Sequence, residues 1–366
     1  MEKIKAYLRK YFIDAMGAMA QGLFASLLIG TIFGTVGKYL GPDYINADFI
    51  NKIGEAFLEM QKFCSGSAGM AIGAAIAYSM KSSPLVIFSS AAVGYIGYSL
   101  GATIQVADGG VINYTAGPAG AFFAVIIACE IGMLVSKKTK VDILVTPLVT
   151  IVSGYIVSRI ICPAVAYLMY WLGEFIGMAT GYAPLVMGIV IAVVVGMILT
   201  LPISSAAICA IIFSTDAIAA SAFSDSLLLA GGAAAVGCCC QMIGFAAASF
   251  RENRWGGVVS QGLGTSMLQM GNICRHPQIW LPATLSSAVC GALSTTVFGL
   301  TCSGVSAGMG TCGLVGIIGI VSSSGTSGKV FLGIGLLCIV LPAALSIVFS
   351  EIMRKLGFIK DGYMAL

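Results

Sequence analysis

Long runs without a charged residue recur along the whole chain. Asp, Glu, Lys and Arg are absent from residues 15–37, 82–107, 109–129, 175–215, 226–250, 255–274, 277–328 and 330–350. About 20 apolar residues in a helix span the hydrocarbon core of a bilayer, so each run is long enough for one crossing. The pattern predicts an all-α polytopic membrane protein, with residues 1–366 forming a single integral membrane domain embedded in a lipid bilayer.

We count about ten transmembrane helices in these runs. The expected helices are residues 15–37, 65–80, 84–105, 117–135, 143–172, 180–200, 203–222, 228–249, 279–299 and 331–352. Residues 1–10, MEKIKAYLRK, form a short basic amphipathic segment that is expected to lie on the membrane surface. The apolar run after Asp14 is of full span length, which is too long for the core of a cleavable signal peptide.

Basic residues indicate the orientation of the chain. They gather in four clusters, at residues 3–10, 137–140, 251–254 and 354–360. With ten spans all four clusters fall on one side of the membrane, and the positive-inside rule identifies that side as the cytoplasm. Both ends of the sequence are therefore expected to be cytoplasmic.

The segment 40–63 differs from the predicted spans because charged residues alternate with apolar ones. We expect an amphipathic helix at the extracellular interface, with Asn46 or Asp48 as its N-cap and no role in substrate binding. Its apolar residues recur at helical spacing, at Phe49, Ile53, Phe57 and Met60.

Two stretches, residues 257–276 and 302–328, contain no charged residue except Arg275 and are rich in Gly, Ser, Thr and Cys. A helix built of them would be weak, because each Gly costs up to ~1 kcal/mol relative to Ala. Irregular backbone survives at membrane depth only where protein or a water-filled cavity surrounds it. We therefore predict two re-entrant hairpins or broken helices that form a solute site, as in many secondary transporters. The alternative is that the small residues only allow close helix packing.

The candidate site is built from polar side chains in these two segments and from two ionisable residues. Amides and hydroxyls offer both hydrogen-bond donors and acceptors, which suits a neutral polar solute. A carboxylate within a predicted span needs a cavity or a partner, for which Arg159 is a candidate. The single histidine is a candidate ligand or, alternatively, an interfacial hydrogen-bonding residue. The candidate residues are Gln261, Thr265, Ser266, Gln269, Asn272, Ser306, Gly308, Gly310, Thr311, Glu130 and His276.

Other kinds of chemistry lack the residues they need. Most of the 12 cysteines lie in apolar runs such as VGCCCQM (236–242), which favours packing over a metal site. The chain has no nucleotide-binding motif and no Ser/His/Asp grouping, and nothing in it predicts contact with nucleic acid. We therefore expect no catalytic residues, no metal and no cofactor.

A short string occurs twice. Residues 64–70 read CSGSAGM, and residues 302–309 read CSGVSAGM, the same string with one inserted Val. The match suggests an internal repeat, although chance is an alternative in a chain with 47 glycines.

The region from Ser249 to Gly316 resembles a known family. Its motifs GLGTSMLQ (262–269), IWLP (279–282) and AGMGTCGLVG (307–316), with LPISSAAI at 201–208, are similar to those of the second EIIC family of phosphotransferase-system membrane proteins, which includes perfringolysin O regulator-like members. The chain departs from the family pattern at Gly271-Asn272 and at His276-Pro277.

The resemblance implies a homodimeric, multi-pass protein of the bacterial cytoplasmic membrane. Such a protein would carry a sugar or sugar-like solute by alternating access and work with a separate cytoplasmic IIB phosphocarrier, so it would be at most the membrane component of a phosphotransferase system. Two alternatives stay open. The protein could be a membrane-embedded sensor that binds the solute without transporting it. The solute could also be anionic, held at helix N-termini with help from Arg275.

Overall fold

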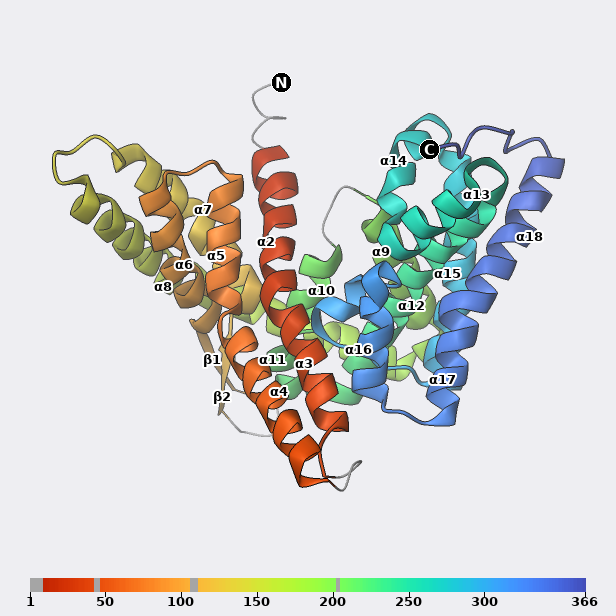
Figure 1. Ribbon diagram of the computed structural model, residues 1–366, viewed down its shortest axis with the longest axis horizontal. Helices are drawn as coiled ribbons and strands as arrows, with labels where there is room; N and C mark the ends of the chain where they lie inside the picture. The colour runs from red at the N-terminus through yellow and green to blue at the C-terminus, as the bar shows by residue number, and fades with distance from the viewer. Residues whose placement is uncertain (1–8, 43–46, 106–110, 202–204) are drawn as a thin grey trace. The chain divides into compact units, whose positions relative to one another are not determined.

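The computed structural model describes residues 9–42, 47–105, 111–201 and 205–366. They divide into two compact units, Met1–Trp171 and Leu172–Leu366, each described by itself below (Figure 1). Helices make up nearly all of the described regular structure, which confirms the all-α class.

The first unit begins with one long helical run. It consists of the π-helix η1 (Arg9–Asp14), α2 (Ala15–Leu23), the π-helix η2 (Phe24–Leu28) and α3 (Ile29–Tyr39). The other helices are α4 (Asp48–Gly66), α5 (Ala68–Ser79), α6 (Pro84–Ser99), α7 (Gly117–Val135) and α8 (Asp142–Tyr182), of which α8 continues into the second unit.

Helices α5, α6 and α7 lie side by side in the first unit (Figure 1). Glycines allow them to approach at the level of the backbone. A Cβ atom built on Gly73 would lie 2.1 Å from the carbonyl oxygen of Ser90, and one built on Gly94 would lie 2.2 Å from that of Gly69. Such small-residue contacts are a common way to pack helices in a membrane.

A two-stranded ribbon follows α6. Strands β1 (Gly101–Gln105) and β2 (Val111–Thr115) pair in antiparallel register, with Gly101 opposite Thr115. The predicted helix over residues 84–105 was therefore wrong at its end, since α6 stops at Ser99. A side chain at Gly101 would lie 1.9 Å from the carbonyl oxygen of Tyr114, so this close strand pairing requires a glycine.

The predicted amphipathic segment 40–63 overlaps α4, which runs from Asp48 to Gly66. Phe49 and Phe63 are 76% and 70% exposed, whereas Phe57 lies against Phe33 of α3 with ring centroids 5.7 Å apart. Ala47, with an extended backbone, occupies the N-cap position, so the predicted cap at Asp48 was wrong and Asp48 lies in the first turn. The other predicted cap, Asn46, lies outside the described residues. The location of α4 at a membrane interface stays a prediction.

The second unit contains helices of very different lengths, from 3 residues in η8 to 25 in α12. They are α9 (Pro184–Thr200), α10 (Ser205–Ile212), α11 (Thr215–Ala220), α12 (Ser224–Ala248), α13 (Phe250–Gly257), η3 (Val258–Gly264), η4 (Ser266–Gln269), α14 (Met270–Arg275), η5 (Pro277–Trp280), α15 (Leu281–Leu293), η6 (Ser294–Phe298), η7 (Gly304–Gly308), η8 (Cys312–Leu314), α16 (Val315–Ser324), α17 (Gly328–Ile334), η9 (Gly335–Val340) and α18 (Leu341–Lys355).

Helix α12 forms the core of the second unit. It packs against α9, α15 and α18 (Figure 1), and 83% of its most apolar 18-residue window is buried. A helix that is apolar on all sides is typical of such a central position. By contrast, the predicted span 203–222 is divided into α10 and α11, because Ser214 adopts extended backbone and accepts a hydrogen bond from the Ala217 N–H at 3.0 Å.

Six of the described helical runs are long and apolar enough to cross a membrane. Their number and composition support a multi-pass membrane protein, while the count of ten spans includes shorter apolar helices and stays a proposal. Only 28% of the most apolar window of α8 is buried, so most of that window is available to face lipid. The six runs are Ala15–Tyr39, Gly117–Val135, Asp142–Tyr182, Ser224–Ala248, Pro277–Phe298 and Gly328–Lys355.

Candidate functional site

The first small-residue segment, 257–276, is a series of short helical pieces. The π-helix η3 ends at Gly264, and Thr265 is fully extended with φ of −161°. The hydroxyl oxygen of Thr265 accepts a hydrogen bond from the N–H of Met267 at 3.2 Å and so caps η4. A second break follows α14 at His276, where φ is −138°. The backbone of this segment is thus interrupted, as a broken helix would be.

The second segment, 302–328, is also interrupted. It begins after Gly299, whose positive φ of +64° ends the helix before it. Two 3₁₀ pieces, η7 and η8, then flank Gly310, which has a φ of +56°, and regular helix resumes with α16. Glycine populates positive φ at no steric cost, so Gly299 and Gly310 allow the chain to turn at these points.

The two segments meet within the second unit. The hydroxyl of Thr311 donates a hydrogen bond to the carbonyl oxygen of Gly262 at 2.6 Å. Neighbouring elements satisfy other groups of the second segment: the Ser205 hydroxyl donates to the Gly308 carbonyl at 2.7 Å, and the Gly304 N–H donates to the Phe213 carbonyl at 2.6 Å. Irregular backbone surrounded by protein in this way is compatible with membrane depth.

Two predicted site residues, Gly308 and Gly310, pack tightly. A Cβ atom on Gly308 would lie 2.5 Å from the carbonyl oxygen of Ser205, and one on Gly310 would lie 2.6 Å from the backbone of Cys238. Ser306 is 5% exposed and faces Gly319, where an added Cβ would lie 2.2 Å from the Ser306 Cβ. Close packing therefore explains the glycines at 308 and 310 without a ligand.

Ser266 belongs to a buried network of hydroxyl and amide groups. Its hydroxyl lies 2.9 Å from that of Thr200, which in turn lies 3.4 Å from the carbonyl oxygen of the Gln241 side chain. That oxygen also accepts a hydrogen bond from the indole N–H of Trp280 at 3.0 Å. The amide nitrogen of Gln241 donates to Thr284 at 3.3 Å.

Sequence reasoning predicted Ser266 as a site residue but missed its buried partners in this network. Gln241 and Thr200 are both fully buried, yet only the cysteines around Gln241 were considered. A signal was present, because Gln241 is a carboxamide in the middle of the apolar helix α12 and a buried amide requires partners. The network ties α12 to α15 and to the end of α9.

Three other predicted residues, Gln261, Gln269 and Asn272, form a chain of amides. The Asn272 side chain donates to the Gln269 side-chain oxygen at 2.9 Å, and Gln269 donates to the Gln261 side-chain oxygen at 3.1 Å. Gln261 continues the chain by donating to the Ser249 hydroxyl at 2.9 Å. These three residues lie close together, and the amides of Gln269 and Asn272 also donate hydrogen bonds to residues 364 and 365 of the same chain.

A cavity of about 500 Å³ lies beside this chain of amides. Of the predicted residues, Asn272 alone is among those lining it. The lining residues are Ser260, Leu268, Gly271, Asn272, Ala365 and Leu366.

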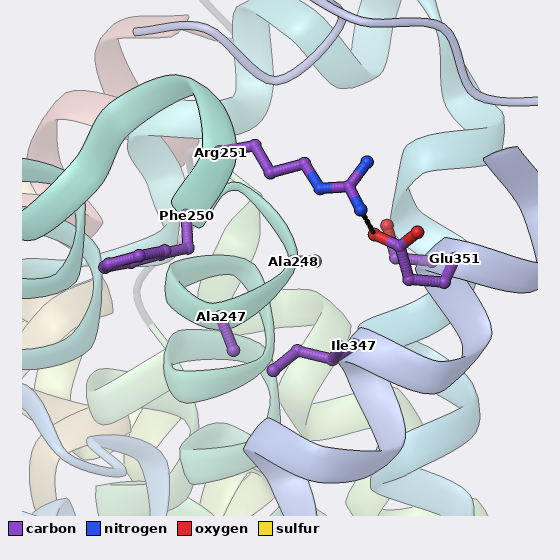
Figure 2. A pocket seen from close by; sticks show the side chains of 7 residues that line it. Ala247, Ala248, Phe250, Arg251, Ile347 and Glu351 are labelled. Carbon is purple, nitrogen blue, oxygen red and sulfur yellow. Dashed lines mark ion pairs between the residues drawn. The ribbon is translucent and has the colours of Figure 1, made fainter.

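A second pocket, of about 330 Å³, has different chemistry. Figure 2 shows Arg251 reaching toward Glu351, with Ala247 and Ile347 forming an apolar side of the pocket. The two charged groups are 2.9 Å apart, and Arg251 is 63% exposed, so their ion pair contributes little to stability. None of the predicted site residues lines this pocket.

Glu130 lies in the first unit, apart in the chain from the other candidates. Its carboxylate accepts hydrogen bonds from the ammonium group of Lys10 and, at 2.8 Å, from the hydroxyl of Tyr11. The predicted need for a partner is met by Lys10 rather than by the expected candidate, Arg159. Burial lowers the pKa of Lys10, but the hydrogen bond and charge of Glu130 outweigh it, and the pKa lies above its ordinary value.

Comparison with known proteins identifies the family. Residues 13–366 match the sequence profile described as phosphotransferase system, EIIC. The chain belongs to this family. The match runs from η1 through α18 and so covers both units. Membership of this family supports a membrane sugar-transport component with a functional link to a IIB protein. No curated protein sequence matches the chain.

Proposed function

We propose that this EIIC-family protein transports a small neutral polar solute, a sugar or sugar-like compound, by alternating access across the bacterial cytoplasmic membrane. The family match over residues 13–366 carries the proposal. Ten spans, a homodimer and cytoplasmic placement of both chain ends belong to the same proposal. A separate IIB phosphocarrier would phosphorylate the bound solute, since we expect no phosphocarrier residue in this chain.

The proposed solute site lies where the segments 257–276 and 302–328 meet, and we propose that both act as re-entrant hairpins. The hydrogen bond from Thr311 to the carbonyl of Gly262 supports this location, because it joins the two interrupted backbones. Ser266 and Asn272 would contribute a hydroxyl and an amide. Such groups donate and accept hydrogen bonds as sugar hydroxyls do, without favouring a charged solute.

A thermal-shift screen of the purified protein in detergent tests the proposal. The probes are glucose, sorbitol, glucose 6-phosphate and citrate. A ligand at a hundred times its dissociation constant stabilises the folded state by ~2.7 kcal/mol, which is a readily measured shift in Tm. We expect stabilisation by a neutral sugar or polyol, and uptake of the same compound into proteoliposomes.

Two variants connect the binding to the proposed site. Thr311→Val removes the hydroxyl that joins the two segments, at nearly constant side-chain volume. Ser266→Ala removes the hydroxyl of the proposed site residue Ser266. Both variants should stay folded but lose the thermal shift. The control is Gln278→Ala, which removes an amide side chain on η5 outside the predicted set and should keep the thermal shift. Stabilisation by the charged probes alone would overturn the neutral class of solute. Binding without uptake would favour the sensor.

A further inference from the structure

Residues 359–366, here called the tail segment, fold back against the region that contains the chain of amides. The turn after α18 passes through Gly357 and Gly362, whose φ angles are +79° and +89°. The side chains of Ile359 and Met364 are 2% and 0% exposed. They are buried in a cluster with residues of α12, α14 and α15, among them Phe245, Ile273 and Ala283.

Side-chain amides bind the main chain of the tail segment. Asn253 and Gln269 donate hydrogen bonds to the carbonyl oxygen of Met364 at 2.7 and 2.8 Å. Asn272 donates to the carbonyl oxygen of Ala365 at 2.8 Å. The Asn253 side-chain oxygen accepts a hydrogen bond from the Leu366 N–H at 2.9 Å. The contacts involve backbone groups of the tail, so they resemble contacts to a bound peptide.

Two further contacts hold the beginning of the tail segment. The Tyr363 ring stacks on the His276 ring with centroids 3.6 Å apart and planes at 2°. Arg354 of α18 forms ion pairs with Asp361 and with Glu252, both at 2.7 Å. The Arg354 side chain is 8% exposed while that of Asp361 is 90% exposed, so the pair with Asp361 is the outer of the two.

We infer that the tail segment is an autoinhibitory strap that competes with the solute for the amides of Gln269 and Asn272. The inference rests on the proposed function. The carbonyl oxygens of residues 364 and 365 occupy the amide donors of Gln269 and Asn272, which the sequence indicates as solute ligands. An amide N–H group donates to a sugar oxygen and to a peptide oxygen in the same way. One amide hydrogen therefore cannot bind the solute and the tail segment at the same time.

The cavity of about 500 Å³ supports a competitive arrangement. Asn272 lines it together with Ala365 and Leu366 of the strap. Leu366 is 56% exposed, so the fold does not enclose the side chain of this strap residue. Departure of the strap would enlarge the cavity next to Asn272 and free the amide that now contacts Ala365.

Loosening the strap in the full chain should tighten solute binding. A protein whose site is free only part of the time binds with an affinity reduced by that fraction. Tyr363→Ala removes the ring stacked on His276, and we expect the dissociation constant for glucose or sorbitol to fall about tenfold. Phe358→Ala removes an exposed ring just before the strap and serves as a control without effect.

Asp361→Asn is a milder second variant, because it removes only the outer ion pair of Arg354. It should tighten binding in the same direction but by less, and it guards against loss of folding in Tyr363→Ala. The strap is overturned if folded Tyr363→Ala and Asp361→Asn bind the probes no more tightly than the wild type, whether or not the wild type binds them. Binding gained only in these variants supports the strap. A strap that fails while wild type still binds and transports a probe leaves the proposed function intact.

Discussion

The two copies of the repeated string adopt different structures. In the first copy, residues 64–70, α4 runs to Gly66 and α5 starts at Ala68, with a turn at Ser67. In the second copy, residues 302–309, Ser303 is extended, Gly304 has a φ of +57°, and only a 3₁₀ piece follows. Strings of small residues therefore permit either conformation.

The neighbours of the two copies account for the difference. The carbonyl groups of Leu300 and Cys302 lie against α12, where Cβ atoms on Gly232 and Gly231 would approach them to 1.8 and 2.1 Å. The first copy instead packs helix on helix, with Gly69 close to the carbonyl oxygen of Gly94 on α6. A groove of glycines on α12 can accept an extended backbone, while α6 accepts a helix.

The largest expected effect concerns the second glycine of each copy, where the copies behave alike. A Cβ on Gly69 would lie 2.8 Å from the carbonyl oxygen of Gly94, and one on Gly308 would lie 2.5 Å from that of Ser205. Gly69→Val and Gly308→Val should each lower stability by about 3 kcal/mol or more, because backbone must move. Thermal unfolding in detergent measures this. A mild effect at Gly308 alone would show that the second copy is loosely packed.

Substitutions of the first glycine of each copy should distinguish the two backbone conformations. Gly304→Ala places a side chain at positive φ and should cost about 1–2 kcal/mol. Gly66 is helical, and nothing lies within 4 Å of a Cβ built on it. Gly66→Ala should therefore be neutral or stabilising by about 0.5 kcal/mol. Opposite shifts in Tm are expected, and equal shifts would contradict the described difference in backbone.

The smallest expected effect concerns, for each copy, one serine hydroxyl that donates a hydrogen bond to a main-chain carbonyl of that copy. Ser205→Ala leaves the buried carbonyl of Gly308 without its hydroxyl partner and should cost about 1 kcal/mol. Ser67 is less buried and donates only to the nearby carbonyl of Cys64, so Ser67→Ala should change the stability by less than about 0.5 kcal/mol. The same unfolding experiment compares them, and Ser205→Thr provides a variant that keeps the hydroxyl.

The sequence predicted the helices whose limits depend on local signals. The predicted span 117–135 coincides with α7, which starts at Gly117 with Pro118 next and ends just before a basic cluster. The predicted span 84–105 was too long, because the pairing of Gly101 with Thr115 depends on a second strand that lies farther along the chain. Long-range pairing of this kind overrides the hydropathy of a single run.

The site could be predicted only in part. The breaks at Thr265 and Gly310 follow from glycines and hydroxyls that disfavour a regular helix, and the sequence showed these directly. The contact of Thr311 with the carbonyl of Gly262 joins residues far apart in sequence. The strap contacts Gln269 and Asn272 through main-chain carbonyl groups, which every residue possesses, so these two contacts left no signal in the sequence.

The glycine groove of α12 also bears on the order in which the protein is assembled. The ribosome completes α12 at residue 248, before it makes residues 300–302, whose carbonyl groups fill the groove at Gly231 and Gly232. Helix α9 is already present at that time and can pack against Gly237 from the other side. During synthesis the face of α12 at Gly237 can therefore be covered by α9, while the face at Gly231 and Gly232 stays uncovered until residues 300–302 are made. This uncovered face of the nascent chain would be accessible to a chaperone or an insertase.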